Sequence, residues 1–356
     1  MMHITSIHAY LQRLPLKQPY AIAYQNIYET EIVFLEISLS NGIIGFGASN
    51  PFPEVIGETP EQTLGLLKSE SIQKHIGKGI DAYREIIADC CRDLPDYPGT
   101  QAALDIALHD AYGKVMQQPI AALYGQVIAS LPTSITIGIK TLPEMIEDAT
   151  HYYHQGFRIL KLKTGISVDE DIERCIKLYE HFGDRFRYRV DANLGYNFAS
   201  LNKFIHETAH LPIELIEQPL PVSENQALVQ FEEPVRMKFV ADESLTSISS
   251  AEKLLQHPHP FGVFNIKLMK AGGILAGKHI ADTAASKGIS IFWGCNDESL
   301  VSITAALHLA YACPNTKYLD LDGSFDVLEH VFSGGFILEN GHLRLNGKPG
   351  LGVYKK

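Results

Sequence analysis

From residue 133 onward, short apolar segments rich in β-branched and aromatic residues alternate with longer segments of helical periodicity. The short segments predict buried strands, and the longer ones predict helices that cross from one strand to the next. Eight strands are expected, over residues 133–139, 158–163, 187–191, 213–217, 238–242, 262–267, 289–294 and 317–321. Such alternation makes the strands parallel, and eight parallel strands can close into an α/β barrel.

The first 125 residues are ordered differently, with strands first and helices afterwards. Alternating polar and apolar residues at the N-terminus predict a first strand, and a second is expected over residues 31–38. Asn41-Gly42 is typical of a hairpin turn and precedes a third strand over residues 43–46. Helices are expected over residues 61–68, 81–89 and 100–115.

The tail of the chain has strand and turn signals but no further unit of strand and helix. We expect it to fold back onto the N-terminal segment. The predicted organisation is an α+β capping domain over residues 1–125, completed by residues 323–356, and a barrel domain over residues 126–322. No linker rich in Pro, Gly or Ser separates the two parts, so they are expected to pack tightly.

Composition and charge exclude several classes of protein. The 30 Lys and Arg residues are outnumbered by 41 Asp and Glu residues, and no basic tract could neutralise a row of phosphates, so no nucleic-acid partner is expected. The apolar segments fall far short of the ~20 residues of a membrane span, and the N-terminus lacks the pattern of a signal peptide. The five cysteines form no CxxC pair and suit the reducing cytoplasm, where we expect the protein to be located.

A charged residue ends each of five consecutive predicted strands: Lys163, Asp191, Glu217, Asp242 and Lys267. The intervals are 28, 26, 25 and 25 residues, so all five side chains are expected at the rim of the barrel where catalytic groups lie. Three carboxylates in a partly dry pocket repel one another unless a cation lies among them. Ligands that are all oxygen favour Mg²⁺. The alternative is that the three are unrelated surface acids.

Lys163 and Lys267 end the second and sixth predicted strands, on opposite sides of the barrel. Two amines that flank one pocket suit proton transfer on both faces of a substrate. A lysine with its ordinary pKa is a poor base at neutral pH, but a nearby cation and a second ammonium group disfavour its charged form. Lys161, on the same strand face as Lys163, is such a neighbour. The alternative is that these lysines are solvated or ion-paired.

The eighth predicted strand ends in Asp320-Leu321-Asp322. Residues two apart share a strand face, so the two carboxylates could together hold an ammonium group. The alternative interpretation is a pair of rim acids that are exposed to water or contact a lysine.

Six short motifs occur in order along the chain: KLK at 161–163, DAN at 191–193, EQP at 217–219, DES at 242–244, NIK at 265–267 and PGLGV at 349–353. Over nearly the whole chain they resemble the muconate-lactonizing subgroup of the enolase superfamily. The resemblance implies a (β/α)7β modified TIM barrel with an α+β capping domain. Within the subgroup, Asp320 and Asp322 together with Gly294-Cys295 resemble the dipeptide epimerases.

The resemblance implies a metal site and an acid/base pair. Asp191, Glu217 and Asp242 would bind one Mg²⁺ per subunit. Lys163 and Lys267 would remove and return a proton from opposite sides.

The resemblance also implies a dipeptide-binding site beside the metal. Lys161 would assist at the substrate carboxylate, and Asp320 and Asp322 would bind the ammonium group of the dipeptide. Thr136 and Cys295 would line the site, although a plain core position is the alternative for Cys295.

One segment departs from relatives specific for Ala-Glu, which carry an arginine in a loop near the N-terminus to pair with the glutamate side chain. The matching residues here, 21–28, include Gln25 and no cation. Burying a carboxylate without a charged partner is unfavourable, so we expect an uncharged second residue, with Gln25 among the substrate-binding residues. The alternative is that Arg13 or Lys17 reaches into the site from elsewhere.

Together these expectations describe a cytoplasmic dipeptide epimerase that inverts the α-carbon of X in Ala-X dipeptides such as Ala-Ala, in a homo-oligomer. Lyases of the o-succinylbenzoate synthase and muconate cycloisomerase kind, or an N-acylamino acid racemase, are alternatives that keep the metal. The Asp320 and Asp322 pair argues against the lyases, because their substrates carry no ammonium group. A peptide-binding protein on an inactivated barrel is an alternative of another class.

Overall fold

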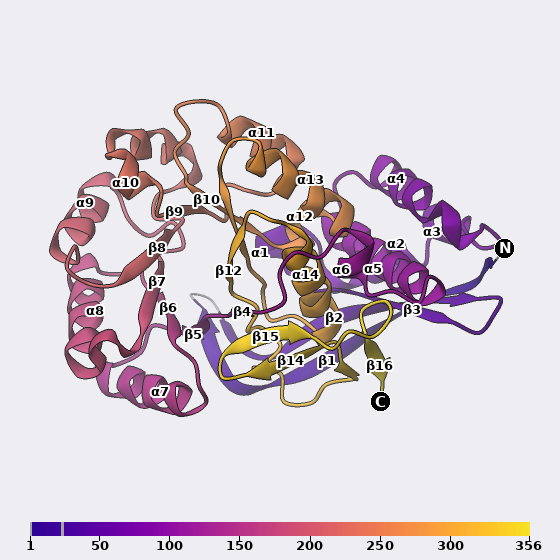
Figure 1. Cartoon of the computed structure of the whole chain (residues 1–356), viewed down its shortest axis with the longest axis horizontal. Coiled ribbons are helices and arrows are strands. Elements are labelled where there is room, and N and C mark those ends of the chain that lie inside the picture. Colours follow the sequence, from indigo (N-terminus) through magenta and orange to yellow (C-terminus); the bar gives the residue numbers. More distant parts are fainter. Residues whose placement is uncertain (1, 23–24) are drawn as a thin grey trace.

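The computed structural model describes residues 2–22 and 25–356, with the side chains of residues 18–22 and 25–27 left out of the description. Figure 1 shows a ring of strands and helices built from the middle of the chain, beside a layer formed by the N-terminal segment and the C-terminal tail. The strands of the ring carry the charged residues predicted from the sequence.

In the described part of the chain, eight parallel strands follow one another from β5 to β12 in sequence order. Their bounds are β5 (Ile135–Ile137), β6 (Ile159–Lys163), β7 (Arg187–Asp191), β8 (Ile213–Glu217), β9 (Phe239–Ala241), β10 (Val263–Ile266), β11 (Ser290–Trp293) and β12 (Thr316–Leu319). The two ends of the sheet meet through a parallel bridge between Thr133 and Leu319, and Ser134 N donates to Leu319 O over 3.0 Å. The sheet therefore closes, and the predicted modified barrel is confirmed.

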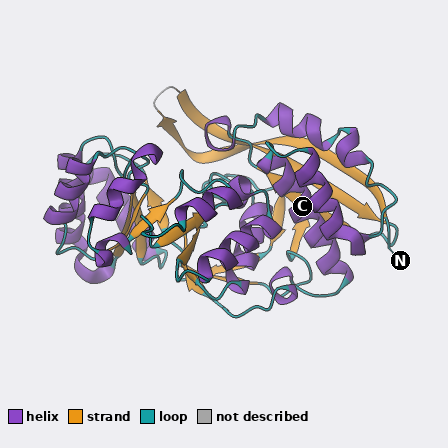
Figure 2. Cartoon of the chain, turned by 90° about the horizontal axis from the view of Figure 1, so that it is seen from above, coloured by secondary structure: helices purple, strands orange, loops and turns teal. Residues whose placement is uncertain are grey.

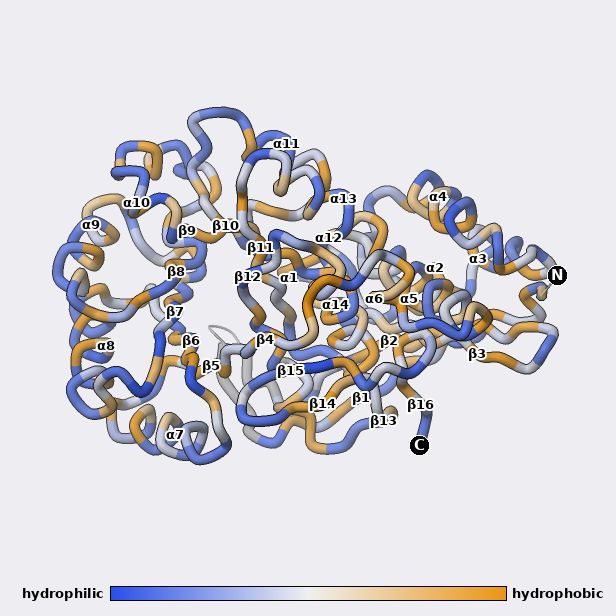
Figure 3. Tube along the Cα trace, in the orientation of Figure 1, coloured by the Kyte–Doolittle hydropathy of each residue, from blue (hydrophilic) through white to orange (hydrophobic). Residues whose placement is uncertain are grey.

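Helices connect successive strands and cover the outside of the ring, as Figure 2 shows from above. They are α7 (Leu142–His154), α8 (Val168–Phe182), η2 (Gly183–Arg185), α9 (Phe198–Glu207), η3 (Val222–Gln230), α10 (Glu233–Arg236), α11 (Ile248–Leu254), α12 (Leu268–Ala271), α13 (Ile274–Ala285) and α14 (Leu300–Ala312). In α8 the apolar residues Ile172, Cys175 and Leu178 are buried at helical spacing. Figure 3 shows the resulting mixture of hydrophilic and hydrophobic positions along the outer helices.

The N-terminal segment forms an antiparallel sheet in the order β1-β2-β3, with helices packed against it. Its elements are β1 (Ile4–Ile22), β2 (Gln25–Leu39), β3 (Ile44–Ser49), α1 (Pro53–Ile56), α2 (Pro60–Leu67), α3 (Glu70–Gln73), η1 (Ile80–Ala82), α4 (Tyr83–Asp93), α5 (Pro98–Val115) and α6 (Ile120–Leu123). The expected hairpin at Asn41-Gly42 joins β2 to β3. Gly47 lets α5 approach closely, because a Cβ there would lie 2.0 Å from Ala103 O.

The C-terminal tail folds back onto this segment, as predicted. Its strands are β13 (Phe332–Gly334), β14 (Phe336–Glu339), β15 (His342–Leu345) and β16 (Val353–Lys355), with β15 pairing to β4 (Leu131–Pro132). The Phe332 ring lies 5.1 Å from Phe34 and 4.9 Å from Phe46, which belong to the N-terminal sheet. The division at residues 125 and 322 stays a prediction.

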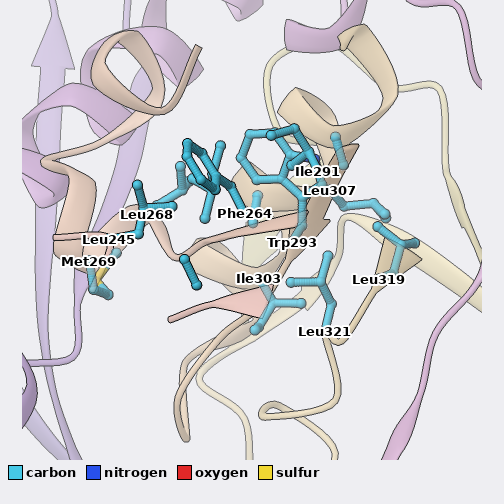
Figure 4. Close-up of a cluster of buried hydrophobic side chains, with 14 of the residues drawn as sticks. Leu245, Phe264, Leu268, Met269, Ile291, Trp293, Ile303, Leu307, Leu319 and Leu321 are labelled. Atoms are coloured by element: carbon cyan, nitrogen blue, oxygen red, sulfur yellow. The ribbon is translucent and has the colours of Figure 1, made fainter. Parts of the chain in front are cut away.

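A large apolar cluster joins the barrel to the layer beside it. Figure 4 shows part of it, with Trp293 of β11 and Leu307 of α14 among side chains from several elements. Both residues have no exposed surface. Within the described residues, no helix is both long and apolar enough to cross a membrane. All five cysteines are free.

Most elements differ from their predicted bounds by a few residues, and the second strand, β2, covers residues 25–39 and not 31–38. Two of the differences have a local cause. The first barrel strand covers residues 135–137 and not 133–139, because Thr133 and Ser134 pair through their backbone with Leu319 at the closure of the barrel, while the pairing with β6 begins at Ile135. Side chains add to this closure, since Thr133 Oγ1 accepts a hydrogen bond from Leu321 N and Ser134 Oγ donates one to Asp320. Helix α4 begins at Tyr83 because the preceding residues, Ile80–Ala82, form a 3₁₀ turn.

Candidate active site

Three buried carboxylates come from three consecutive strands of the barrel. Asp191 and Glu217 end β7 and β8, and Asp242 follows β9, with 1%, 1% and 2% of their surfaces exposed. The parallel register places Asp191 opposite Glu217, and Lys163 opposite Asp191. The predicted acids therefore form one layer at the carboxyl end of the barrel, which we call the acid layer.

The ammonium group of Lys161 lies among these acids. Its Nζ is 3.1 Å from Asp191 Oδ2, 2.8 Å from Glu217 Oε2 and 2.8 Å from Asp320 Oδ2. Lys161 is 4% exposed, and burial acts to lower its pKa, but the surrounding carboxylates outweigh burial and raise the pKa well above its ordinary value. The group is therefore a cation held at the centre of the layer.

Lys163 and Lys267 approach the acid layer from β6 and from the end of β10, on opposite sides of the ring. Lys163 Nζ donates to Asp191 Oδ2 over 2.8 Å and to Asn193 Oδ1 over 2.9 Å. Lys267 Nζ donates to Asp242 Oδ2 over 3.0 Å. The structure thus places the two lysines as a pair that flanks the acids.

The acids differ in how readily they hold a negative charge. Burial raises the pKa of Glu217 to about 8, and the neighbouring charge of Asp191 acts in the same direction. Burial also acts to raise the pKa of Asp191, but Lys161 and Lys163 outweigh it and hold that pKa at about 2. The layer therefore carries more negative charge than its surroundings readily support, and Glu217 needs further positive charge to be ionised at neutral pH.

The donor set suits a hard divalent cation, because it consists of buried carboxylate oxygens. The partner of Glu217 Oε2 among the described residues is the Lys161 ammonium group, 2.8 Å away. As the side chains stand, no three His, Cys, Asp or Glu residues of the described chain are grouped closely enough to enclose an ion. A cation in this layer would therefore share the carboxylates with Lys161.

Asp320 and Asp322 lie in the segment that follows β12, 3% and 6% exposed. Asp320 is bound by Lys161, while Asp322 Oδ2 accepts a hydrogen bond from Thr136 N over 2.8 Å. Burial raises the pKa of Asp322 to about 7, and Asp320 adds to the effect. Two close carboxylates of this kind favour a cationic ligand.

Cys295 lies beside the same two acids. Its Sγ is 3.2 Å from Asp320 O and 3.9 Å from Asp322 Oδ1. The thiol therefore borders the aspartate pair together with Thr136, and the expectation that both line a substrate site stays a prediction. Burial raises the pKa of the Cys295 thiol well above its ordinary value. The thiol therefore stays protonated at neutral pH, and a protonated thiol is a poor nucleophile.

Two further polar side chains of this layer were not predicted from the sequence. Lys270 is 4% exposed and forms an ion pair with Asp242, and Asn265 Nδ2 donates to Glu217 Oε1 over 2.7 Å. Both lie within three residues of Lys267, in the segment NIKLMK. Lysine and asparagine near a strand end are too common to have been chosen without the structure.

Gln25, predicted to bind substrate, lies outside the residues whose side chains the structure describes. Arg13, one of two alternatives for a cation in the site, forms an ion pair with Glu31. Lys17, the other, donates through Nζ to Phe325 O over 2.6 Å, three residues beyond Asp322. A cation from the N-terminal hairpin therefore does reach the segment that follows β12.

Comparison with known proteins identifies the family. Residues 144–354 match the enolase C-terminal domain-like model, and residues 5–125 match the N-terminal domain of mandelate racemase and muconate lactonizing enzyme. The chain belongs to the enolase superfamily. The expected membership of its muconate-lactonizing subgroup is confirmed.

Relatives in the superfamily cover this chain almost completely. An L-Lys-D/L-Arg epimerase of Desulforapulum autotrophicum is 45% identical over 99% of both chains. The L-Ala-D/L-Glu epimerase of Bacillus subtilis is 30% identical over 96% of this chain and 93% of its own. The crystal structure of a dipeptide epimerase from Methylococcus capsulatus, complexed with Mg and the dipeptide L-Arg-D-Lys, superposes with a TM-score of 0.96, at 40% identity and with 99% of each chain covered. This member of the enolase superfamily is accordingly an isomerase of the racemase and epimerase type.

Proposed function

We propose that the enzyme epimerises dipeptides at the α-carbon of the second residue by transferring a proton between two lysines. One observation carries the proposal: Lys163 and Lys267 flank the buried acid layer from opposite sides of the barrel. Two amines that reach one carbon from opposite directions can remove a proton from one face and return a proton to the other. The names of the relatives agree with this reaction.

Asp191, Glu217 and Asp242 are the residues that would hold Mg²⁺, one ion per subunit. When bound, the ion supplies positive charge that offsets the negative charge developing at the substrate carboxylate. The high pKa of Glu217 supports this assignment, because a carboxyl group buried beside Asp191 is ionised more readily next to added positive charge.

The protonation state of Lys267 depends on the same acids. Burial acts to lower its pKa, but Asp242 outweighs burial and raises the pKa above the ordinary value. Lys267 therefore holds a proton that it can donate. To act as a base, Lys267 must have a lower pKa. Its pKa falls when the Asp242 carboxylate is shared with a second cation, because Asp242 then stabilises the ammonium form less.

The dipeptide would lie between the acid layer and the aspartate pair. Lys161 would assist at its carboxylate, Asp320 and Asp322 would bind its ammonium group, and Thr136 and Cys295 would border it. The raised pKa of Asp322 supports a cationic group there, because an ammonium would relieve the repulsion from Asp320.

For the side chains of the dipeptide, we propose a preference for cationic residues. Two relatives are named for Lys and Arg substrates. Further acidic residues lie beyond the aspartate pair: burial raises the pKa of Asp326 to about 6 and Asp297 adds to the effect, while Lys17 and Lys140 act to lower it. Complementary charge favours a cationic partner for such a surface. An uncharged second residue, as in Ala-Ala, stays a prediction to be tested alongside.

The test is metal-dependent exchange of the α-proton in deuterated water, followed by mass spectrometry over a library of Ala-X, Lys-X and Arg-X dipeptides. We expect Lys-Arg and Arg-Lys to exchange fastest, and EDTA to stop exchange until Mg²⁺ is restored. If Ala-Ala exchanges fastest, the result would instead support a preference for dipeptides with an uncharged second residue.

Three results would replace the proposed reaction. Exchange confined to N-succinyl amino acids would indicate an N-acylamino acid racemase. Loss of water from an o-succinylbenzoate precursor, or lactone formation from muconate, would indicate a lyase or a cycloisomerase. Peptide binding without any exchange would indicate a binding protein.

A further inference from the structure

A buried arginine lies one layer beneath the acids. Arg189 precedes Asp191 by two residues on β7, so its side chain points to the same side of the sheet, and it is 2% exposed. Its guanidinium group lies over the rings of Phe292 and Tyr318, at 5.1 and 5.2 Å from their centroids. Burying a cation is costly unless its donors are used, so the partners of Arg189 indicate its role.

Those partners lie at the closure of the barrel. One terminal nitrogen of Arg189 donates to Leu319 O over 2.6 Å and to Ser134 Oγ over 3.1 Å. The nearest acid is Glu214, with Oε2 3.4 Å from Arg189 Nε. Leu319 ends β12, and Ser134 precedes β5. The arginine thus connects the first and last strands of the barrel.

Ser134 links Arg189 to Asp320 through a hydrogen bond. The hydroxyl has one proton and two oxygen acceptors, Asp320 Oδ1 at 2.6 Å and Leu319 O at 3.2 Å. The carboxylate is closer and charged, so it takes the proton. Since Arg189 donates to Leu319 O and to the Ser134 hydroxyl, the chain of donors runs from Arg189 through Ser134 to Asp320.

The other oxygen of Asp320 accepts from Lys161 over 2.8 Å. Asp320 is therefore held at one oxygen by Ser134 and at the other by the central ammonium of the acid layer. Because β12 ends at Leu319, Asp320 lies beyond the regular strand, and these side-chain contacts set the direction of its carboxylate. Asp322 is held independently, through Thr136 N.

We propose that Ser134, oriented and polarised by Arg189, is a positioning residue that fixes the Asp320 carboxylate for the ammonium group of the substrate. The inference rests on the proposed dipeptide function. Without the hydroxyl, one oxygen of Asp320 loses its buried donor, and the carboxylate turns toward another partner. The enzyme then recognises the α-ammonium group poorly, while its contacts to the rest of the dipeptide stay intact.

The experiment compares Ser134→Ala with Ser134→Thr, which restores a hydroxyl, and with Thr133→Val as the matched control. Thr133 lies at the same closure of the barrel, and its Oγ1 accepts from Leu321 N over 2.9 Å without contacting Asp320. Turnover of L-Lys-L-Arg is measured together with competitive inhibition by 6-aminohexanoyl-L-Arg, which has the same shape but lacks the α-ammonium group.

For Ser134→Ala we expect the KM of L-Lys-L-Arg to rise about tenfold with kcat changed less than about threefold, as for loss of uniform binding. The inhibition constant of 6-aminohexanoyl-L-Arg should stay within about twofold of the wild type, because this ligand has no α-ammonium group to contact Asp320. Ser134→Thr should recover most of the KM, and Thr133→Val should leave both values near the wild type. Equal weakening of the two ligands, or equal effects of Ser134→Ala and Thr133→Val, would overturn the inference.

Two further measurements keep the inference testable in other cases. If Ser134→Ala does not fold, Arg189→Met keeps a long unbranched side chain but removes the nitrogen that donates to Ser134 and to Leu319, and it should raise the same KM. If the wild type exchanges no dipeptide, the proposed function fails, and crystal structures of the wild type and Ser134→Ala decide the positioning role. An Asp320 carboxylate in the same orientation in both would refute it.

Discussion

At the scale of single residues, the lysines of the site differ in ways that their sequence positions do not show. Lys161 has 5% of its side chain exposed and contacts three carboxylates, while Lys163, two residues on, has 34% exposed and contacts one of them. Both point to the same side of β6. The deeper of the two is thus held as a permanent cation, and the outer one is free to approach a substrate.

The two-lysine reaction predicts a distinct defect for each of its amines. Lys163→Ala and Lys267→Ala should each lose epimerisation by a factor of about 10³, because removing a general acid or base costs about 10² to 10⁴ in rate. Each variant should still exchange the α-proton of one epimer, since one amine remains. Proton NMR of the L,L and L,D dipeptides in deuterated water measures this.

Lys278→Ala is the control for these variants, because Lys278 is paired with Asp282 on the outer helix α13. Its rates should equal those of the wild type. Exchange of both epimers by both variants would show that a different group moves the proton.

At the scale of elements, the loops after β6 and β7 pack against each other directly beyond the strand ends that carry Lys163 and Asp191. Gly165 and Gly195 bring the two loops together, since a Cβ on Gly195 would lie 2.2 Å from Gly165 O. Asp171 of α8 fastens both loops by accepting from Gly165 N and from Tyr196 Oη, each over 2.9 Å. This contact joins segments about thirty residues apart, so no local pattern indicates it.

Gly195→Ala should therefore disturb both stability and catalysis. The added methyl group meets backbone and not a flexible side chain, so the loops must separate. We expect a melting temperature lower by several degrees and a kcat lower by about tenfold, measured by thermal unfolding and by turnover. Gly65→Ala on the exposed face of α2 has open space and should instead be neutral or stabilising by up to about 1 kcal/mol. Equal behaviour of the two variants would contradict this interpretation.

At the scale of the whole molecule, one buried histidine joins three parts of the chain. His308 of α14 accepts from Ala121 N of α6 over 3.1 Å and contacts Leu351 O of the tail over 3.3 Å. It is 1% exposed, and burial lowers its pKa to about 4. The neutral ring is required, because a protonated Nδ1 cannot accept from Ala121.

This predicts a loss of stability in acid with a known sign. The unfolded chain takes up a proton at His308 near pH 6.5 and the folded chain only near pH 4, so the contribution is complete above pH 6.5 and is lost as the pH falls toward 4. The loss amounts to about 3 kcal/mol. Urea unfolding at pH 7 and pH 4.5 gives the free energy of unfolding at each pH. The difference between the two values should be smaller for His308→Asn than for the wild type, because the Asn amide oxygen can still accept from Ala121 but does not titrate. Exposed His279→Asn should behave as the wild type.

Local sequence was sufficient to determine the barrel, the order of its strands and the charged residues that end them. The period of strand and helix is a short-range property, and the strand ends place Lys163, Asp191, Glu217, Asp242 and Lys267 at one rim before any contact is known. The preference for an uncharged substrate was inferred from one missing arginine near Gln25, and a single absent cation says little about charges supplied by other segments.

Only the tertiary structure decided the rest, because it depends on contacts between distant parts of the chain. The approach of Ser134 to Asp320 spans 186 residues, and that of Lys161 to Asp320 spans 159. Whether such groups meet depends on how the barrel closes and on which side chain fills each layer, and neither is encoded in local periodicity. The central position of Lys161, the buried Arg189 beneath it and the link from Arg189 through Ser134 to Asp320 therefore became visible only in the folded chain.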